Sequence, residues 1–129
     1  MPKTSHYPKK IITSGPYSPA ISIENFIFIS GQGTYDPSSG EKYLEDISIQ
    51  TKLALENLKR VLESAGITFE DLIKINLFLT HEKHLSRVDK VYKQYFGNIS
   101  LPPRSTIIVS ALPGNMGIEI EAIAYVSRD

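Results

Sequence analysis

One arginine and two glutamates in the last quarter of the chain are the residues best placed to do chemistry. Arg104 follows two prolines and begins an apolar run, and Glu119 and Glu121 begin the next run, after a Pro-Gly turn. Both runs are typical of strands, and we expect the two strands to be neighbours. A guanidinium and a carboxylate brought together there could hold a small anion and activate a water beside it.

Both kinds of residue also have purely structural interpretations. An arginine at the start of a strand often belongs to a surface or interface ion pair, and position alone favours that interpretation for Arg104. Glu119 and Glu121 are two residues apart, so they share one side of a strand. There they could simply be solvated, or pair with lysines across the sheet.

Two glycine-containing segments nearer the N-terminus could line a pocket. The loop at residues 14–20 holds one glycine and two prolines, which fix a stiff path around Tyr17. A tyrosine in such a loop is more often packed than catalytic, so we assign Tyr17 to a pocket wall. Ser30-Gly31-Gln32-Gly33 ends an apolar run, and its glycines either let the backbone approach a ligand or permit a bulge. This segment lacks the lysine of a phosphate-binding loop.

The composition limits any chemistry to oxygen and nitrogen groups, and the histidine spacing gives no reason to expect a metal site. The chain has no cysteine, which excludes disulfides, thiolate nucleophiles and cysteine-ligated metal centres. His81 and His84 are three residues apart at an expected helix start, which is not the spacing of the zinc-binding His-Glu-x-x-His motif. We therefore expect both histidines to be exposed to solvent.

Length and charge restrict the class of protein. The 129 residues fit one domain, placed at residues 1–129, since no repeat, low-complexity tract or linker divides them. Fourteen lysines and arginines balance fourteen aspartates and glutamates, so no basic field attracts nucleic acid or a membrane surface. No apolar run is long enough for a membrane span or a secretory signal. We expect a cytoplasmic protein and leave a mitochondrial address open.

The hydrophobic periodicity predicts an α+β domain. Strands are expected at residues 10–13, 25–30 and 73–80 and in the two runs after residue 103, and helices from about residue 46 to Gly66 and from Leu85 to Gly97. In the strand at 73–80, the alternation predicts that Ile73, Ile75, Leu77 and Leu79 share one face. The order β-β-β-α-β-α-β-β favours a single mixed sheet with two helices packed on one face.

The other face of that sheet is also expected to be apolar. Phe26 and Phe28 alternate with the isoleucines of their strand, and Ile123 and Tyr125 alternate with alanines in the last strand. Two helices can cover only one face, and large exposed apolar patches are rare on monomers. We therefore expect a closed homo-oligomer with clefts between its subunits.

Several of these motifs together resemble the Rid family, also called the YjgF or L-PSP endoribonuclease-like family. The resemblance is carried by Pro103-Arg104-Ser105, by the Leu112-Pro113 turn and Ile118-Glu119-Ile120-Glu121-Ala122, by Gly15-Pro16-Tyr17-Ser18, by Ser30-Gly31-Gln32, and by Asp36-Pro37 through Gly40. It runs through nearly the whole chain in the same order. It implies a homotrimer with a chorismate-mutase-like fold and one site at each subunit interface.

The resemblance also implies an activity and a set of site residues. Members of the archetypal branch hydrolyse reactive 2-imino acids, such as 2-aminoacrylate and 2-iminobutanoate, to 2-keto acids and ammonia. Arg104 matches the arginine that binds the substrate carboxylate, and Glu119 matches the acid that positions the attacking water. Tyr17, Ser30 and the Gly31 backbone match positions that line the pocket.

Two residues depart from the common pattern of that family. Thr106 stands where many members have a cysteine whose backbone helps to hold the substrate, so we include Thr106 among the substrate-binding residues. Asp89 stands where asparagine is frequent, and its charge would weaken the binding of an anion if it faces the cleft. We expect these changes to alter substrate preference rather than the class of reaction.

Three functions stay open at this point. The first is a cofactor-independent deaminase of 2-iminopropanoate and 2-iminobutanoate that uses Arg104 and Glu119. The second is a trimeric module that binds a 2-keto acid without turnover. The departures at Thr106 and Asp89 are the reason to consider it. The third is RNA cleavage, which the sequence supports least, because it has neither a catalytic histidine pair nor a basic stripe with interleaved aromatics.

Overall fold

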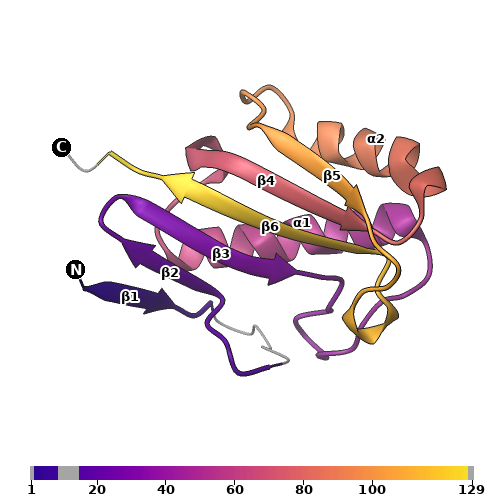
Figure 1. Cartoon of the computed structure of the whole chain (residues 1–129), viewed down its shortest axis with the longest axis horizontal. Helices are drawn as coiled ribbons and strands as arrows, with labels where there is room; N and C mark the ends of the chain where they lie inside the picture. Colours follow the sequence, from indigo (N-terminus) through magenta and orange to yellow (C-terminus); the bar gives the residue numbers. More distant parts are fainter. Residues whose placement is uncertain (1, 9–14, 128–129) are drawn as a thin grey trace.

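A computed structural model describes residues 2–8 and 15–127 of the chain. The elements are β1 (Lys3–His6), β2 (Ala20–Ile23), β3 (Phe26–Gln32), α1 (Ile47–Ser64), β4 (Leu72–Leu79), α2 (Leu85–Phe96), β5 (Arg104–Ile108) and β6 (Ile118–Tyr125), as drawn in Figure 1. This is the predicted order of strands and helices. The strand expected at residues 10–13 lies outside the described residues, and the sequence did not locate β1 or β2.

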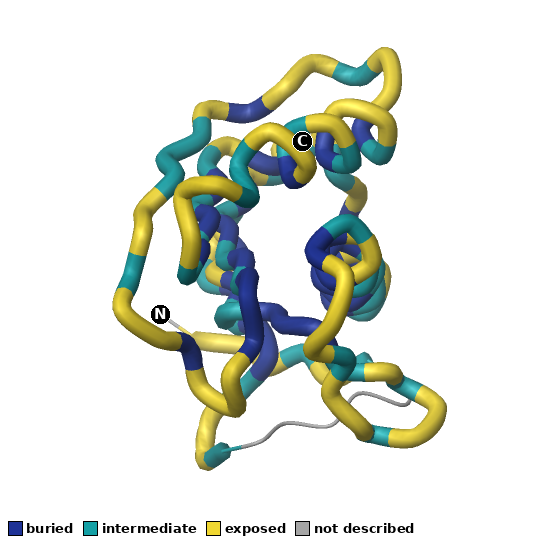
Figure 2. Tube along the Cα trace, turned by 90° about the vertical axis from the view of Figure 1, so that its right-hand side faces the viewer, coloured by how far each residue is buried: buried dark blue, intermediate teal, exposed yellow. Residues whose placement is uncertain are grey.

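The strands form one mixed sheet with the order β1-β2-β3-β6-β4-β5. Neighbouring strands are antiparallel except for β4 and β5, which α2 connects as a parallel pair. Both helices lie on one face of the sheet, and Figure 2 shows the buried parts of the sheet and of α1 turned toward each other. The predicted α+β domain with two helices on one face is confirmed.

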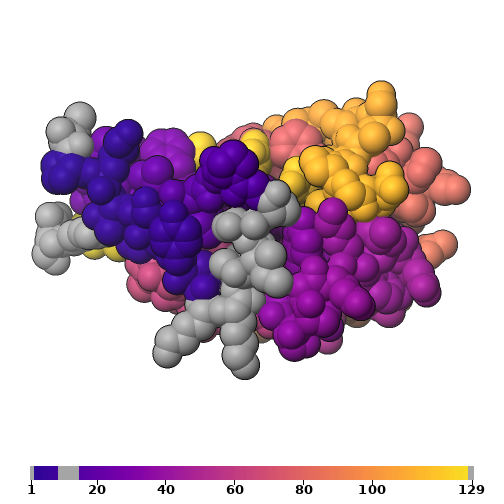
Figure 3. Space-filling view, turned by 90° about the horizontal axis from the view of Figure 1, so that it is seen from below, coloured from indigo at the N-terminus to yellow at the C-terminus, as the bar shows by residue number. Residues whose placement is uncertain are grey.

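The expectation that the strands of Arg104 and Glu119 are neighbours is wrong. β4 lies between β5 and β6, because α2 returns the chain to the far edge of β4 before the turn at Pro113–Asn115 carries it back across the end of that strand. Two backbone hydrogen bonds hold the crossing: Val109 N donates to Leu79 O over 2.8 Å, and Thr80 N donates to Gly117 O over 3.3 Å. In Figure 3 the crossing loop, orange to yellow, lies beside the segment that follows β3.

Both helices end at the glycines that the sequence predicts, and α1 begins just after the expected residue 46. Asp46 precedes α1, and its side chain accepts hydrogen bonds from the N–H groups of Ser48 and Ile49. Gly66 lies just after α1 with a φ of +74°, and Gly97 ends α2 with a φ of +61°. Glycine adopts this left-handed conformation without the penalty that a Cβ brings, which explains both predicted ends.

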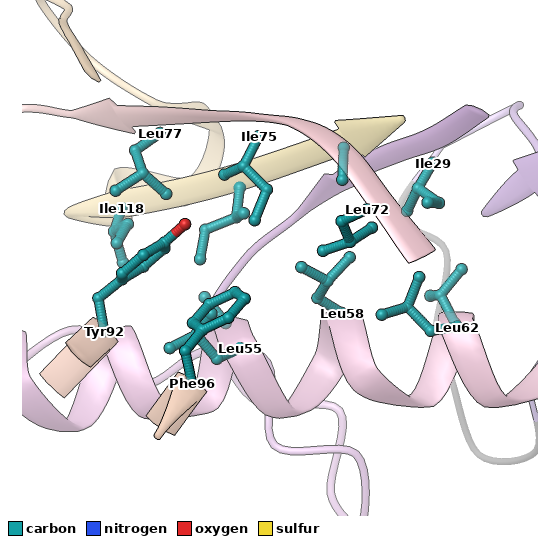
Figure 4. Close-up of a cluster of buried hydrophobic side chains, with 14 of the residues drawn as sticks. Ile29, Leu55, Leu58, Leu62, Leu72, Ile75, Leu77, Tyr92, Phe96 and Ile118 are labelled. Carbon is teal, nitrogen blue, oxygen red and sulfur yellow. The ribbon is translucent and has the colours of Figure 1, made fainter. Parts of the chain in front are cut away.

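A single apolar core fills the space between the sheet and the helices. Most of its members come from α1, α2 and the inward face of β3, β4 and β6, and Figure 4 shows side chains of the helices directed toward those of the strands. Fully buried members include Ile27, Leu55, Leu58, Val61, Leu62, Ile75, Leu77, Leu79, Val88, Ile118 and Ile120. Truncating one such leucine to alanine costs about 2–5 kcal/mol of stability, so this core fixes the strands that carry the candidate site.

The alternation predicted for β4 fails at the start of the strand. Ile75, Leu77 and Leu79 are buried as expected, whereas Ile73 is 44% exposed. The register of β4 against β6 shifts between Leu72 and Lys74, so Leu72 occupies the inward position instead. A bulge of this kind turns one residue out of the alternating pattern.

The face of the sheet opposite the helices, called the open face below, is apolar and uncovered within one chain. Phe26, Phe28 and Tyr125 are 39%, 48% and 41% exposed. Their rings touch, with centroids 5.1 Å apart for Phe26 and Tyr125 and 6.3 Å apart for Phe26 and Phe28. The predicted second apolar face therefore exists. Among the described helices, none is long and apolar enough to cross a membrane.

Candidate functional site

Four of the predicted site residues line one hollow, called the Glu119 cleft below. Tyr17, Ser30, Gly31 and Glu119 contribute to this hollow of about 400 Å³, which lies where β3 ends and β6 begins. Its other walls come from Gly33, Tyr35, Pro113, Met116 and Glu121. This volume is within the usual range of small-molecule sites, so a three- or four-carbon acid and water fit into it.

The glycines of β3 are explained by what lies against them. The register of β3 against β6 shifts between Ile29 and Gln32, so a bulge is present there. A Cβ at Gly31 would stand 2.7 Å from Glu119 Cδ, and a Cβ at Gly33 would collide with Met116 Sδ. Of the two sequence alternatives, the bulge is present, and the close approach seen at Gly31 is to the side chain of Glu119 rather than to a ligand.

Ser30 forms two hydrogen bonds with the backbone of the loop that carries Tyr17. The Ser30 hydroxyl donates to Ser18 O over 2.7 Å, and the Ser30 N–H donates to Pro19 O over 2.9 Å. Tyr17 is 45% exposed and forms one wall of the Glu119 cleft, as expected from the sequence. The hydroxyl proton of Ser30 is thus engaged in holding the loop, and only its lone pairs remain for a ligand.

The environments of Glu119 and Glu121 differ in a way that separates their roles. Asn76 Nδ2 donates to Glu121 Oε1 over 3.1 Å, whereas within the described chain the Glu119 carboxylate has no hydrogen-bond or ion-pair partner. Burial raises the pKa of Glu119, and the neighbouring Glu121 raises it further. A half-buried carboxylate with free lone pairs and a raised pKa is suited to accept a proton from water and return it.

Arg104 does not line the Glu119 cleft within one chain. Arg104 pairs with Ile75 on one side of β4, and Glu119 pairs with Phe78 on the other side. Arg104 and Glu119 are therefore separated by two strand spacings across the sheet, about 10 Å, and by three residues along the strands, about another 10 Å. A small acid cannot span this separation. The alternation of β4 also puts the two side chains on opposite faces, since Ile75 is buried toward the helices and Phe78, three residues further on, is half-buried and faces the other way.

The guanidinium of Arg104 is held against α2 by an aspartate and a tyrosine. Arg104 Nη2 lies 2.7 Å from Asp89 Oδ1, and its central carbon lies 4.9 Å from the centre of the Tyr92 ring. The contact with Asp89 is an ion pair without aligned hydrogen-bond geometry. The structural interpretation left open for Arg104, an ion pair, is therefore present within the chain.

Thr106 shares the surroundings of Arg104 rather than those of Glu119. It lies two residues further along β5, so it faces the same side of the sheet, and it is half-buried. The predicted site residues thus fall into two groups: Tyr17, Ser30, Gly31 and Glu119 on one side, and Arg104 and Thr106 on the other.

A second hollow adjoins the Glu119 cleft on the open face. It measures about 470 Å³ and shares Tyr17, Ser30 and Glu121 with the first. Its walls are mainly apolar, with Phe28 and Ile123 prominent among them. The Glu119 cleft therefore lies beside the apolar surface of the open face.

The two histidines expected to be exposed differ from each other. His81 is exposed, whereas His84 is half-buried, with its ring edge-on to His81 at 5.3 Å. Burial lowers the pKa of His84, and the nearby positive groups lower it further. Among residues 2–8 and 15–127, no group of three His, Asp or Glu side chains lies close enough to hold a metal ion.

Sequence reasoning missed several residues that shape these two groups. Met116 and Tyr35 line the Glu119 cleft, and Tyr92 lies under Arg104. Met116 also accepts the N–H of Thr34 at its sulfur over 3.2 Å, which joins the crossing loop to the segment that follows β3. No spacing rule points to Met116 or Tyr35, whereas Tyr92 lies three residues after Asp89, on the same face of α2.

Comparison with known proteins gives a consistent match along the chain. The family described as Endoribonuclease L-PSP matches residues 8–126. A RutC family protein of Pyrococcus horikoshii is 46% identical over 122 residues, which cover 95% of this chain and 94% of that protein. The 2-iminobutanoate/2-iminopropanoate deaminase of Mus musculus is 41% identical over 110 residues, or 85% of this chain and 81% of the mouse protein.

Solved structures agree with the observed fold. The crystal structure of E. coli TdcF with bound serine superimposes with a TM-score of 0.91 at 33% sequence identity. The match covers 96% of this chain and 99% of the TdcF chain. The arrangement of six strands and two helices described above is therefore shared with a protein that holds a small amino acid.

Proposed function

Because this chain belongs to the Rid family, also called the YjgF or endoribonuclease L-PSP family, we propose that it is an imine deaminase. Its substrates are small 2-imino acids, such as 2-iminopropanoate and 2-iminobutanoate, and its products are 2-keto acids and ammonia. Relatives that bear the name 2-iminobutanoate/2-iminopropanoate deaminase support this proposal over most of their length, at 39–41% identity.

The observation that carries the proposal is the state of Glu119. Its carboxylate lies in a hollow of about 400 Å³, without a partner in the described chain and with a pKa raised by burial. An unpaired, partly desolvated carboxylate lowers the stability of the fold, and such groups are concentrated at functional sites. Its neighbour Glu121 is held by Asn76 and is therefore less suited to proton transfer.

Glu119 would act on a water molecule beside the imine carbon. The carboxylate accepts a proton from the water as the water oxygen attacks the carbon of the protonated imine, giving a carbinolamine. Glu119 then returns this proton to the nitrogen. The carbon–nitrogen bond breaks as the hydroxyl group gives its proton to Glu119, and this proton then passes to the departing ammonia. The products are a keto acid and ammonium, and Glu119 is again a carboxylate. No oxidant or reductant is needed.

In the assembled protein, Arg104 of one subunit would bind the carboxylate of a substrate that lies in the Glu119 cleft of the neighbouring subunit. Within one chain Arg104 and Glu119 are on opposite faces of the sheet, so one chain cannot bring both to one small molecule. The uncovered open face beside the Glu119 cleft supports assembly into a closed homotrimer with a site at each interface. A planar guanidinium suits a carboxylate better than an ammonium does.

The test is a coupled assay with a threonine dehydratase, which supplies the imine, and keto-acid formation as the signal. The protein should accelerate keto-acid release above the spontaneous rate, and Glu119→Gln should slow it by at least about 100-fold. Glu70→Gln, which removes an exposed carboxylate far from the cleft, is the matched control and should match the wild type. A Glu119→Gln protein as fast as the wild type would overturn the proposal.

The second candidate is a binding module without turnover. It is favoured by the separation of Arg104 from Glu119, because within one chain a ligand held by Arg104 has no carboxylate of Glu119 beside it to act on it. Calorimetric binding of pyruvate together with no acceleration of imine hydrolysis would select this candidate.

A further inference from the structure

The surroundings of Arg104 suggest a role for Asp89 that rests on the proposed function of Arg104 as a carboxylate anchor. Asp89 and Tyr92 lie three residues apart on α2 and both face the start of β5. Together they fix the guanidinium: the Asp89 carboxylate lies 2.7 Å from Nη2, and the Tyr92 ring lies beneath the central carbon. Figure 4 shows that Tyr92 itself is anchored in the core, with its hydroxyl directed toward the sheet.

This arrangement leaves Arg104 with free donors but little net charge. A guanidinium has five N–H groups, and Asp89 approaches only one nitrogen, so other N–H groups remain for a ligand. The side chain of Arg104 is 24% exposed, so a ligand can reach it. However, the Asp89 carboxylate already balances the positive charge. An incoming carboxylate therefore meets a neutral ion pair rather than a free cation.

The charge of the whole ligand then decides how well it binds. A 2-keto acid is a net anion, and the Asp89 carboxylate repels it. A protonated 2-imino acid, or an amino acid such as serine, carries a positive nitrogen that offsets this repulsion. Two carboxylates that share a guanidinium stand roughly 6 Å apart, where at an effective dielectric constant of about 40 their repulsion weakens binding about tenfold.

We propose that Asp89 is a specificity-determining residue that makes the site favour zwitterionic 2-imino acids over their anionic 2-keto acid products. Asp89 leaves the orientation of Arg104 intact and removes most of its long-range attraction for anions. It therefore weakens product inhibition by the keto acid.

The experiment compares pyruvate, an anion, with serine, a zwitterion, by isothermal titration calorimetry on the wild type and on Asp89→Asn. Asparagine keeps the shape of the side chain and removes its charge. We expect Asp89→Asn to tighten pyruvate binding about tenfold, with a change of less than about threefold for serine. The keto acid should inhibit Asp89→Asn correspondingly more strongly, through a lower inhibition constant rather than a lower kcat.

Two further variants separate charge from structure. Asp89→Glu keeps the negative charge and should bind pyruvate as weakly as the wild type does. Glu70→Gln makes the same change in net charge at an exposed, remote position and should leave both affinities unchanged. Equal tightening of pyruvate and serine, or no tightening of pyruvate, in a folded Asp89→Asn protein would overturn the inference.

Failure of this inference can be told apart from failure of the proposed function. Imine hydrolysis that depends on Glu119, combined with unchanged pyruvate affinity in Asp89→Asn, refutes only the role of Asp89. Absent hydrolysis combined with tighter pyruvate binding refutes the deaminase and retains Asp89 as the residue that selects ligands by charge.

Discussion

Glu119 lies directly against the backbone of Gly31, so close that a Cβ at residue 31 would stand 2.7 Å from Glu119 Cδ and 2.8 Å from Oε1. Real Cβ atoms do not approach other heavy atoms this closely. The bulge at the end of β3 therefore determines where the proposed catalytic carboxylate can be, and the glycine is required by contact rather than by a left-handed backbone.

The first prediction follows from this contact. Gly31→Ala should displace the Glu119 carboxylate and lower kcat/KM for imine hydrolysis by about tenfold or more, because misplacement of a catalytic group by a fraction of an ångström to 1 Å is costly. Steady-state kinetics in the coupled dehydratase assay measure the loss.

Gly66→Ala is the matched control for that variant. Gly66 has a φ of +74° and no neighbour near a Cβ, so alanine there should cost about 1 kcal/mol of stability and leave kcat/KM unchanged. If Gly31→Ala retained full activity, Glu119 could move freely, and the positioning role of the bulge would be wrong.

The second prediction concerns the pH dependence of activity. Burial, and then Glu121, raise the pKa of Glu119, so the carboxylate form that the proposed mechanism requires is lost as the pH falls through this raised value. Glu121→Gln removes the like charge and should shift the acidic limb of the kcat/KM profile to lower pH. A pH series on both proteins measures the shift, and an unchanged limb would mean that another group controls it.

The sequence predicted those parts of the fold that depend on local pattern. The helix stripes, the caps at Gly66 and Gly97 and the alternation of β6 all appear where expected, because each is set by residues within a few positions of each other. The strand order was missed, because the position of β4 between β5 and β6 depends on pairing across distant parts of the chain.

The candidate site was likewise predicted only in part. Tyr17, Ser30, Gly31 and Glu119 do meet, as the motifs suggested, whereas Arg104 is turned toward α2. Its partner there lies 15 positions before it in the sequence and gives no spacing signal. Bulges such as the one that exposes Ile73 are equally invisible to a strict alternation rule.

The third prediction is that removing the charge of Glu119 stabilises the fold. The pKa of Glu119 is higher in the folded protein than in an unfolded chain, so the folded state binds its proton more tightly. Stability is then lost as the pH rises through the unfolded and then the folded pKa, and it stays lower at neutral pH. Glu119→Gln should therefore raise the Tm at pH 7.

Thermal denaturation of Glu119→Gln and the wild type at pH 4 and pH 7 checks this sign. The difference in Tm should be larger at pH 7, where the wild-type carboxylate is charged, and should shrink at pH 4. A lower Tm for Glu119→Gln at pH 7 would indicate that the carboxylate makes a stabilising contact in the assembled protein.

The fourth prediction tests whether two subunits build one site. Arg104→Ala and Glu119→Gln should each be inactive as pure proteins. When the two are co-expressed, some interfaces combine the intact Glu119 of one subunit with the intact Arg104 of its neighbour. Random mixing in a closed ring makes about a quarter of the interfaces native, so about a quarter of wild-type activity should return. Light scattering on the same samples gives the number of subunits.

The control for this mixing experiment pairs Gly31→Ala with Glu119→Gln. Both changes damage the half of the site that one chain contributes around Glu119, so no arrangement of these two subunits yields a native interface. Activity restored by the first mixture and not by the second assigns Arg104 and Glu119 to different subunits. If neither mixture recovers activity although the subunits exchange, both residues must act within one chain, and the site would require Arg104 to leave Asp89 and cross the edge of the sheet.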